Sequence, residues 1–352
     1  MKDTIRVLIV DDSPLIREIL VNMLEDTPGF LVVGQAQDGE EAVQLAACLR
    51  PDVITMDIRM PRMNGLDATR KIMSTTPTPI VVVATSIYDA DLNIAFNAVA
   101  AGALTIVEKP KGLSPTDYEA VREQLTTALR LMSEVQVVTL WSADRQAAAS
   151  RPKVAERTPQ AKVELIAIAA STGGPGTLRQ ILAGLPADLS IPILVVQHIT
   201  PGFAHGFAHW LSSVTPFPAA IAQNGEAVAP GRVLIAPEGT HMTVTPGGAI
   251  RLDPSAPVNG QRPSATRLFE SVAKAYGPAA VGVILTGMGD DGVDGLEALR
   301  RAGGQVIAQD EESCVVFGMP KVAIERGVVD QVLTPPEIAQ SLSRLNGYRK
   351  GV

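Results

Sequence analysis

Short apolar runs alternate with amphipathic segments along the first 130 residues. Ile5–Val10 is apolar apart from Arg6, as expected of a parallel strand that is covered on both faces. After this run, Ser13-Pro14 begins a segment whose apolar residues recur at helical spacing. The pattern predicts further strands at Leu31–Ala36, Val53–Met56, Ile80–Ala84 and Ala103–Val107, and helices at Gly39–Arg50, Gly65–Ser74, Asp91–Ala101 and Thr116–Met132. Five strands alternating with five helices predict an α/β domain with a doubly wound parallel sheet over residues 1–130.

A second alternation begins at Val163, after a segment of different composition. Residues 131–162 lose the pattern, and 143–161 are rich in Ala, Gln, Ser, Arg, Pro and Lys, which is typical of an exposed interdomain linker. Over 163–350 we expect strands at Leu165–Ala170, Ile193–Gln197, Arg232–Ala236, Ala280–Leu285 and Gln305–Ala308, helices at Gly176–Leu185, Gly202–Val214, Ser264–Tyr276 and Gly292–Ala302, and a β-hairpin insertion turning at Pro246-Gly247-Gly248. The second half is therefore predicted to be another doubly wound α/β domain.

Length, charge and composition narrow the class of protein. A chain of 352 residues exceeds the roughly 250–300 at which single cores stop growing, so two domains are expected. A net charge of −7 and an aromatic content of 4% argue against a nucleic-acid partner. No apolar run approaches the ~18–20 residues of a membrane span, and the first strand begins too early for a signal peptide. Cys48 and Cys314, one in each half, are expected to be buried thiols of a cytoplasmic protein.

Acidic residues follow two of the predicted strands in the first half. Asp11 and Asp12 leave the first strand, Asp57 leaves the third, and Lys109, followed by a proline, leaves the fifth. The carboxyl ends of parallel strands open on one edge of a sheet, so these four side chains should meet there. Three carboxylates favour a hard divalent cation, most simply Mg²⁺, which bridges to a phosphoryl group, and Lys109 adds a fixed positive charge. The pattern predicts a phosphoacceptor site.

Because it has Asp11, Asp12, Asp57 and Lys109 at these positions, the segment 3–130 resembles a response-regulator receiver domain, which has a flavodoxin-like sheet. The resemblance implies that Asp57 is the phosphorylated aspartate, that Asp11, Asp12 and Asp57 hold Mg²⁺, and that Lys109 contacts the phosphoryl group. A histidine kinase is the implied phosphodonor. The family's switch hydroxyl usually follows the fourth strand directly, where this chain has Ala84 and then Thr85, so Thr85 is the candidate phosphoryl contact. Ile106 stands where the family often has an aromatic switch residue.

In the second half, Ser171 and His198 each follow a predicted strand. Ser171 stands where a strand turns through Gly173-Gly174 into a helix, and the helix N-terminus offers backbone donors to an oxyanion. This arrangement suits a nucleophilic serine or, equally, a phosphate-binding loop. His198 favours the nucleophile, because a strand-end histidine is placed to take a proton from a nearby serine.

The segment Thr286-Gly-Met-Gly-Asp-Asp-Gly292 follows a third apolar strand. Either Asp290 or Asp291 could orient the histidine, and one of them could instead cap the following helix. His205 and His209 lie at i and i+4 on a predicted helix, where they could form half of a metal site. The simpler interpretation is that they lie on the surface or contact a partner. His241 is expected in a loop that lines a cleft.

Five short segments of the second half carry a family resemblance: Ala-Ser-Thr-Gly-Gly-Pro, Val-Val-Gln-His, Ala-Pro-Glu-Gly-Thr-His, Leu-Thr-Gly-Met-Gly-x-Asp-Gly and Ser-Cys-Val-Val-Phe-Gly-Met-Pro. With these segments, residues 163–335 resemble the catalytic domain of the chemotaxis methylesterases. The resemblance implies catalysis by Ser171, His198 and Asp291, with no cofactor for the esterase. Residues 262–266 depart from the family's usual Pro-Ser-Val-Asp, at what we expect to be a cleft wall. Cys314 lies in an apolar run and is expected to be packed rather than nucleophilic.

Together the two resemblances predict a phosphorylation-activated protein-glutamate methylesterase that acts on methylated chemoreceptors and also deamidates glutamine. A non-catalytic signalling adaptor that binds receptor or kinase is the main alternative. A DNA-binding regulator is disfavoured, because the second half has no basic recognition helix.

Overall fold

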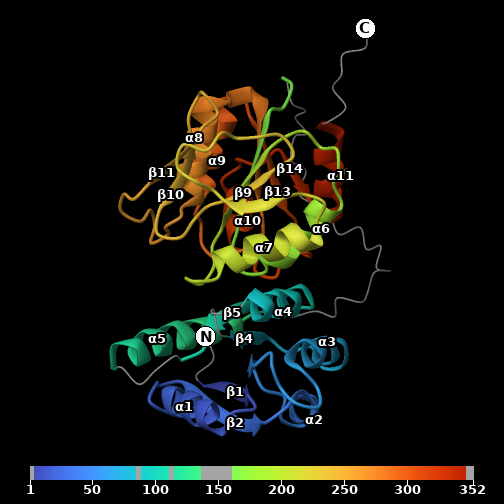
Figure 1. Cartoon of the computed structure of the whole chain (residues 1–352), viewed down its shortest axis with the longest axis vertical. Helices are drawn as coiled ribbons and strands as arrows, with labels where there is room; N and C mark the ends of the chain where they lie inside the picture. Colours follow the sequence, from blue (N-terminus) through green and yellow to red (C-terminus); the bar gives the residue numbers. More distant parts are fainter. Residues whose placement is uncertain (1–3, 85–88, 111–114, 136–160, 346–352) are drawn as a thin grey trace. The chain divides into compact units, whose positions relative to one another are not determined.

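The structure is a computed structural model that describes residues 4–84, 89–110, 115–135 and 161–345 (Figure 1). The chain divides into two compact units, Met1–Ala147 and Ala148–Val352. Each unit is an α/β fold with its own buried core. Across the described ranges, none of the helices has the length and apolar character needed to cross a membrane.

Unit 1 is built on a five-stranded parallel sheet in the order β2-β1-β3-β4-β5. Its strands are β1 (Ile5–Val10), β2 (Phe30–Ala36), β3 (Val53–Met56), β4 (Ile80–Ala84) and β5 (Thr105–Glu108), and its helices are α1 (Pro14–Glu25), α2 (Gly39–Leu49), α3 (Gly65–Thr75), α4 (Asp89–Ala100) and α5 (Pro115–Met132). The apolar residues of β1, β3 and β4 are buried, which is why these strands show no polar alternation. The predicted doubly wound sheet is confirmed.

Short polar side chains end the strands of unit 1 and begin its helices. Ser13 accepts a hydrogen bond from the Ile16 amide and caps α1, and Asp38 accepts from the Glu40 and Glu41 amides and caps α2. Such caps satisfy amides that have no partner within the helix. They also bring the chain out of the sheet at its carboxyl edge, where the acidic residues lie.

Unit 2 contains a seven-stranded parallel sheet in the order β14-β13-β12-β6-β7-β9-β8. Its strands are β6 (Leu165–Ala170), β7 (Ile193–Gln197), β8 (Ala219–Ile221), β9 (Val233–Ile235), β12 (Ala280–Ile284), β13 (Gln305–Gln309) and β14 (Gln331–Leu333), and its helices are α6 (Gly174–Ala183), α7 (Ala204–Val214), α8 (Ala265–Ala275), α9 (Val293–Arg301), α10 (Met319–Glu325) and α11 (Pro335–Leu345). The chain steps from β6 to β7 on one side and later returns to β12 on the other, so β6 is flanked by both.

The hairpin insertion is also confirmed. β10 (His241–Val244) and β11 (Ile250–Asp253) pair antiparallel, and Gly248 adopts a φ of 73° in the turn between them. The hairpin packs against α8 (Figure 1), and the Val244 amide donates to Ser271 Oγ at 3.0 Å. This contact ties the hairpin to the helix that reaches the candidate site.

Sequence patterns missed two strands and two α-helices of unit 2. The three-residue strands β8 and β14 lie at the two edges of the sheet and are too short to show a period. The seven-residue helix α10 has the same difficulty. Helix α11 did carry a signal: the Thr334 and Glu337 side chains bond each other's backbone amides, which is a capping box followed by an apolar stripe.

One prediction about the cysteines is wrong. Cys48 is exposed, because it lies on the face of α2 opposite the buried Ala42 and Ala46. Cys314 is half-buried, and burial raises the pKa of its thiol, so this cysteine is not an activated nucleophile.

Candidate functional site

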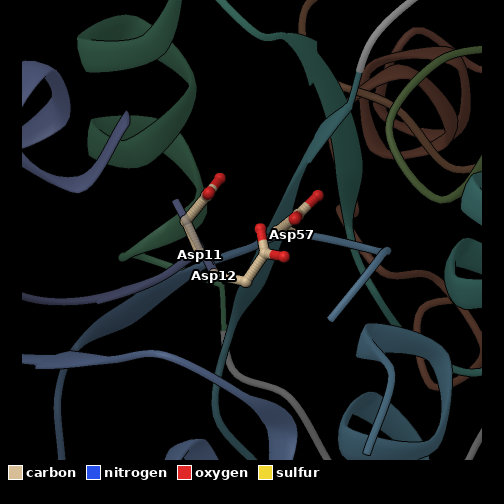
Figure 2. A group of neighbouring side chains, drawn as sticks. All are labelled: Asp11, Asp12 and Asp57. Carbon is tan, nitrogen blue, oxygen red and sulfur yellow. The ribbon is translucent and has the colours of Figure 1, made fainter. Parts of the chain in front are cut away.

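The carboxyl edge of the unit 1 sheet gathers three carboxylates and one lysine. Asp11, Asp12 and Asp57 each offer a carboxylate oxygen within 4.8 Å of the others (Figure 2). Lys109 Nζ lies 2.8 Å from Asp11 Oδ2 and 2.8 Å from Asp57 Oδ1. The structure therefore brings together all four residues that the strand ends predicted.

Burial dominates the electrostatics of this acidic cluster. Burial raises the pKa of Asp57 to about 6, Lys109 opposes this rise, and the neighbouring Asp11 adds to it. Although burial by itself lowers the pKa of Lys109, the attraction of Asp57 and Asp11 outweighs it and raises that pKa above its usual value. One lysine does not neutralise three carboxylates. The oxygen-only donor set and the excess negative charge fit a hard divalent cation such as Mg²⁺.

Backbone contacts hold the acidic cluster in place. The Ser13 amide donates to Asp11 Oδ1 at 3.0 Å, and the Ile58 amide donates to Asp57 Oδ1 at 2.7 Å. A side chain at Gly65 would come within 2.0 Å of the Asp57 carbonyl oxygen, so the loop can pass this close only as glycine. Beside the acidic cluster lies a cavity of about 600 Å³, lined by Asp12, Ile58, Arg59, Met60, Pro61, Asn64 and Leu66.

The predicted switch residues of the receiver lie only partly within the described ranges. Ala84 ends β4 and Ile106 lies in β5, and both are buried. Thr85, the candidate phosphoryl contact, lies outside the described residues. The role of Thr85 stays a prediction.

In unit 2, Ser171 and His198 follow adjacent parallel strands. Ala170 of β6 pairs with Gln197 of β7, so the two residues that come next lie side by side at the carboxyl edge. The His198 amide donates to the Ala170 carbonyl at 2.9 Å, and the Ser171 amide donates to the Thr286 carbonyl at 3.0 Å. Ser171 is thus held between the segments that follow β7 and β12. It is half-buried rather than fully exposed.

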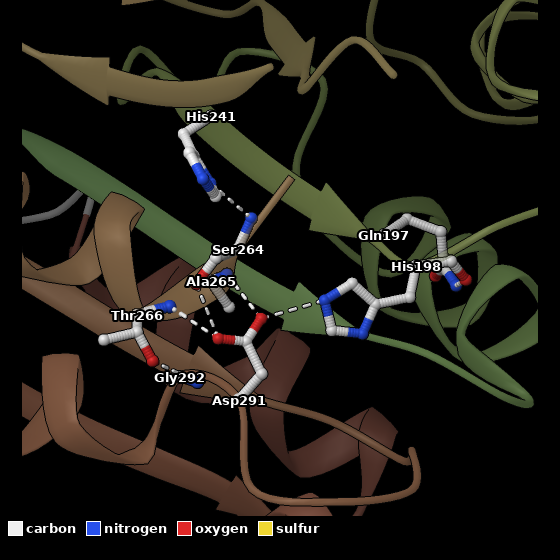
Figure 3. Close-up of polar contacts among 8 residues, drawn as sticks. All are labelled: Gln197, His198, His241, Ser264, Ala265, Thr266, Asp291 and Gly292. Atoms are coloured by element: carbon white, nitrogen blue, oxygen red, sulfur yellow. Dashed lines mark hydrogen bonds and ion pairs between the residues drawn. The ribbon is translucent and has the colours of Figure 1, made fainter. Parts of the chain in front are cut away.

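Asp291 reaches His198 across this edge. His198 Nε2 lies 2.9 Å from Asp291 Oδ2 (Figure 3). Because β6 lies between β7 and β12, the contact spans the end of the strand that leads to Ser171. Asp291 is buried with 3% of its surface exposed, whereas Asp290 is exposed. Of the two candidate aspartates, the structure brings only Asp291 to the histidine.

The Asp291 carboxylate accepts three further hydrogen bonds from the start of α8. Oδ1 accepts from Ser264 Oγ at 2.7 Å and from the Thr266 amide at 3.1 Å, and Oδ2 accepts from the Ala265 amide at 2.7 Å. Burial alone would raise the pKa of Asp291, but the bonds from His198, Ser264 and Ala265 outweigh it and lower that pKa below its usual value. Asp291 is therefore a carboxylate that can only accept.

This pairing decides the tautomer of His198. Since Asp291 accepts, the proton of the neutral imidazole stands on Nε2 and Nδ1 is unprotonated. A base nitrogen is thus available on the side of the ring away from the carboxylate.

The loop after β12 packs directly on Ser171. A side chain at Gly287 would come within 2.7 Å of Ser171 Cβ, and one at Gly173, whose φ is 78°, would come within 2.5 Å of Val315 Cβ. Glycine is required at both positions. Thr286 reinforces this contact, because its Oγ1 donates to the Thr172 carbonyl at 2.9 Å. Met288, next in the loop, is 52% exposed at the rim of the site.

Two buried glutamines, which sequence reasoning passed over, hold the same loops. Gln197 Nε2 donates to the carbonyls of Ser171 and His198, at 2.7 and 2.8 Å. Gln309 Oε1 accepts from the Thr286 amide at 2.8 Å. A signal was available for Gln197, which is the one polar residue of its strand and ends it; Gln309 also ends its strand, but that strand begins with Gln305 as well.

The expectation that residues 262–266 form a cleft wall fails at three positions, because Ser264, Ala265 and Thr266 are buried and contact Asp291, whereas Arg262 is exposed and Pro263 half-buried. Thr266 Oγ1 accepts from the Gly292 amide at 2.8 Å. The expectation that His241 lies in a loop and lines a cleft is wrong, because His241 begins β10 and is fully buried. His205 and His209 are exposed on α7, and within the described ranges the acidic cluster is the only group of three or more metal-binding side chains.

The fold and the two sites define a class of protein. A flavodoxin-like sheet with three carboxylates and a lysine at its edge is that of a response-regulator receiver domain, and here it is joined to an α/β unit with serine, histidine and aspartate at one edge. The response regulator receiver domain family matches residues 7–115, and the CheB methylesterase family matches residues 166–342.

Two relatives match this chain over nearly the whole length of both proteins. The chain is 46% identical, over 97% of both chains, to protein-glutamate methylesterase/protein-glutamine glutaminase 4 of Myxococcus xanthus. It is 48% identical to protein-glutamate methylesterase/protein-glutamine glutaminase 3 of Anaeromyxobacter dehalogenans, over 96% of this chain and 98% of that one. The crystal structure of the Thermotoga maritima CheB methylesterase catalytic domain matches with 40% identity and a TM-score of 0.51, covering 53% of this chain and all of that chain. The protein belongs to the CheB methylesterase family, with an N-terminal receiver domain.

Proposed function

We propose that this protein is a phosphorylation-activated protein-glutamate methylesterase that hydrolyses γ-glutamyl methyl esters on chemoreceptors and deamidates their glutamines. The names of the full-length relatives support both activities. The observation that carries the proposal is the 2.9 Å contact between His198 and Asp291 across the end of the strand that precedes Ser171. A phosphate-binding loop alone does not account for this pair.

In the proposed reaction, Nδ1 of His198 takes the proton of Ser171 Oγ as the oxygen attacks the ester carbonyl carbon. Asp291 holds the imidazole and stabilises its charged form. The tetrahedral intermediate collapses when the carbon–oxygen bond to the methoxy group breaks and His198 returns the proton, which releases methanol. Water, deprotonated by His198, then splits the acyl-enzyme and restores Ser171. With a glutamine substrate, ammonia leaves in place of methanol.

The negative charge of the intermediate needs preorganised donors. We assign this role to backbone amides at Met288 and in the turn that follows Ser171. The close approach of Gly287 to Ser171 supports the assignment, because it brings this backbone to the reacting hydroxyl.

The receiver part of the proposal concerns Asp57. Its carboxylate accepts the phosphoryl group from a histidine kinase, Asp11, Asp12 and Asp57 hold Mg²⁺, and Lys109 and Thr85 contact the phosphoryl oxygens. Mg²⁺ supplies neutralising charge to the phosphoryl oxygens when bound. Lys109 already bridges Asp11 and Asp57, which places its charge beside the acceptor oxygen.

Activation requires that phosphorylation change how the receiver acts on the esterase. We propose that the unphosphorylated receiver, at 1–130, inhibits the catalytic domain, at 163–350, to which the linker 131–162 joins it. Phosphorylation relieves inhibition only if the phosphorylated receiver binds the esterase less well, and a difference of a few kcal/mol is enough.

The test is a methanol-release assay on methylated receptor, with and without a small phosphodonor. We expect release by the full chain to rise with the phosphodonor, and a fragment that begins at Lys162 to be fast without it and indifferent to it. Equal rates for the fragment and the unphosphorylated full chain would remove inhibition by the receiver. If neither form releases methanol and a serine-reactive fluorophosphonate leaves Ser171 unlabelled, the protein is an adaptor.

A further inference from the structure

A fourth polar residue connects to the Ser171, His198 and Asp291 group from within the core. His241, the first residue of β10, is fully buried, and both of its ring nitrogens have partners. Nδ1 lies 3.1 Å from the Ser264 amide nitrogen, and Nε2 lies 3.1 Å from the Ala256 carbonyl oxygen (Figure 3 draws the first contact).

These partners leave one protonation state for His241. A backbone amide can only donate, so Nδ1 must be the acceptor and carries no proton. A carbonyl oxygen can only accept, so Nε2 must carry the proton. The ring is therefore neutral, with a fixed tautomer and a fixed orientation.

The next link, Ser264, is an unusual helix cap. It stands at the N-cap of α8, yet its side chain makes no capping bond to the helix. Its hydroxyl donates to Asp291 Oδ1 instead, and Asp291 accepts from the first amides of the helix, those of Ala265 and Thr266. Ser264 can hold Asp291 only while its own backbone stays in place, and its amide is held by His241.

We propose that His241 is a positioning residue for ester hydrolysis. Its neutral imidazole holds the Ser264 amide, Ser264 Oγ holds Oδ1 of Asp291, and Oδ2 is thereby aimed at His198. The inference rests on the proposed function of this site, but it concerns a residue that touches neither substrate nor the reacting atoms.

The obvious alternative is that His241 only anchors the hairpin to α8. The chain offers a matched control, because the Val244 amide donates to Ser271 Oγ at the other end of the same strand. Ser271→Ala removes a hairpin–helix hydrogen bond that does not lead to Asp291. Anchoring alone predicts that Ser271→Ala and His241 variants of equal stability have equal activity.

The test compares His241→Asn, His241→Gln, His241→Leu and Ser271→Ala in the full chain. Asn places an amide oxygen near the position of Nδ1 and can accept from Ser264, whereas Gln reaches the position of Nε2 and restores only the Ala256 contact. We expect His241→Leu to lower kcat roughly tenfold with KM unchanged, because a small misplacement of a catalytic group affects the transition state and not substrate binding. His241→Asn should recover most of the loss, His241→Gln should not, and Ser271→Ala should keep the parental kcat.

A second readout separates this inference from the identity of the substrate. The rate at which a fluorophosphonate labels Ser171 needs no receptor, and it should fall in parallel with kcat across the series. If the parent chain labels well but hydrolyses no receptor ester, the proposed function fails while the labelling series still tests His241. Equal labelling of the Asn and Gln variants, or a loss in Ser271→Ala as large as in His241→Leu, overturns the inference. The Asn and Gln pair decides the matter even if the Leu variant does not fold.

Discussion

Both units place a buried aspartate at the carboxyl edge of a parallel sheet, but the two carboxylates differ in how they are satisfied. Asp291 accepts hydrogen bonds from four groups, and its pKa lies below the usual value. Asp57 is also buried, but burial outweighs the help of Lys109 and raises its pKa to about 6. Hydrogen bonds within the protein therefore stabilise the ionised form of Asp291. The surroundings of Asp57 carry too little positive charge to do the same, as suits a site that takes a cation and a phosphoryl group.

The largest expected effect comes from removing Ser171, the proposed nucleophile. Ser171→Ala should lower ester hydrolysis by roughly 10⁴-fold or more, and His198→Ala nearly as much, because members of such a unit act together. Methanol release measures the loss. Ser343→Ala, which deletes a serine hydroxyl on α11 away from the site, is the control and should retain full activity. Substantial activity in Ser171→Ala would exclude a seryl acyl-enzyme.

The equivalent change in unit 1 removes Asp57, the proposed phosphoryl acceptor. Asp57→Asn should show no acyl-phosphate, because the amide lacks a nucleophilic oxygen, and its basal esterase rate should stay unchanged and unresponsive to a phosphodonor. Phosphate incorporation, followed by its lability in base, measures the first part. Incorporation into Asp57→Asn at the parental level would place the phosphorylation on another residue.

Substitutions at the neighbouring residues Asp291 and Asp290 test whether the buried, hydrogen-bonded aspartate is the one that hydrolysis needs. Asp291→Asn should slow hydrolysis by roughly 10²–10⁴-fold. The NH₂ group of asparagine would face hydrogen-bond donors that the carboxylate now accepts from, so the side chain would no longer orient His198. The substitution should also lower the free energy of unfolding by about 2–4 kcal/mol, since a buried hydrogen-bonded charge network is broken. Asp290→Asn, at an exposed position, should change the rate less than about twofold. The reverse order would mean that Asp290 is the catalytic aspartate.

The lowered pKa of Asp291 also sets the sign of its pH dependence. Its ionised form stabilises the fold above the usual carboxyl pKa of 3.8, and that contribution is lost as the pH falls through the lower folded-state value. In unfolding measured against pH, the parent chain should therefore lose more stability toward acid than Asp291→Asn does.

The smallest expected effect concerns Mg²⁺ and Asp57, the carboxylate whose pKa is raised. Because the folded-state pKa of Asp57 is raised, the metal-free protein takes up a proton as the pH falls through about 6. The loss of folding stability that burial of the ionised Asp57 causes is full above this pH and becomes smaller from there toward pH 3.8. Mg²⁺ binds the ionised form, so it should raise the unfolding temperature of unit 1 by a few degrees at about pH 8 and far less at about pH 5. Asp57→Asn is the control and should lose most of the shift. A shift of equal size at both pH values would show that Mg²⁺ binds elsewhere.

Much of this molecule could be predicted from local pattern. The strands Leu165–Ala170 and Ile193–Gln197 are predicted with the bounds that the structure has, because each is a short, largely apolar run whose length and flanking turn residues favour a buried strand over a helix. The acidic cluster followed from the rule that parallel strands share one carboxyl edge, and the structure brings Asp11, Asp12, Asp57 and Lys109 together as expected. Edge strands of three residues carried no such signal.

The chain by itself determined which residue types stand at which strand ends, and hence two α/β units with a candidate site at the edge of each. Spacing alone could not choose between Asp290 and Asp291, since adjacent residues have the same strand-end position, and only the family resemblance favoured Asp291. Tertiary structure shows which of the two contacts His198: the amides of α8 and the hydroxyl of Ser264 bind the buried Asp291, and Asp290 is exposed. The same holds for His241, whose partners are 15 and 23 residues away in sequence. Hydrogen bonds between distant segments depend on how helices and strands pack, and no local period of the chain records them.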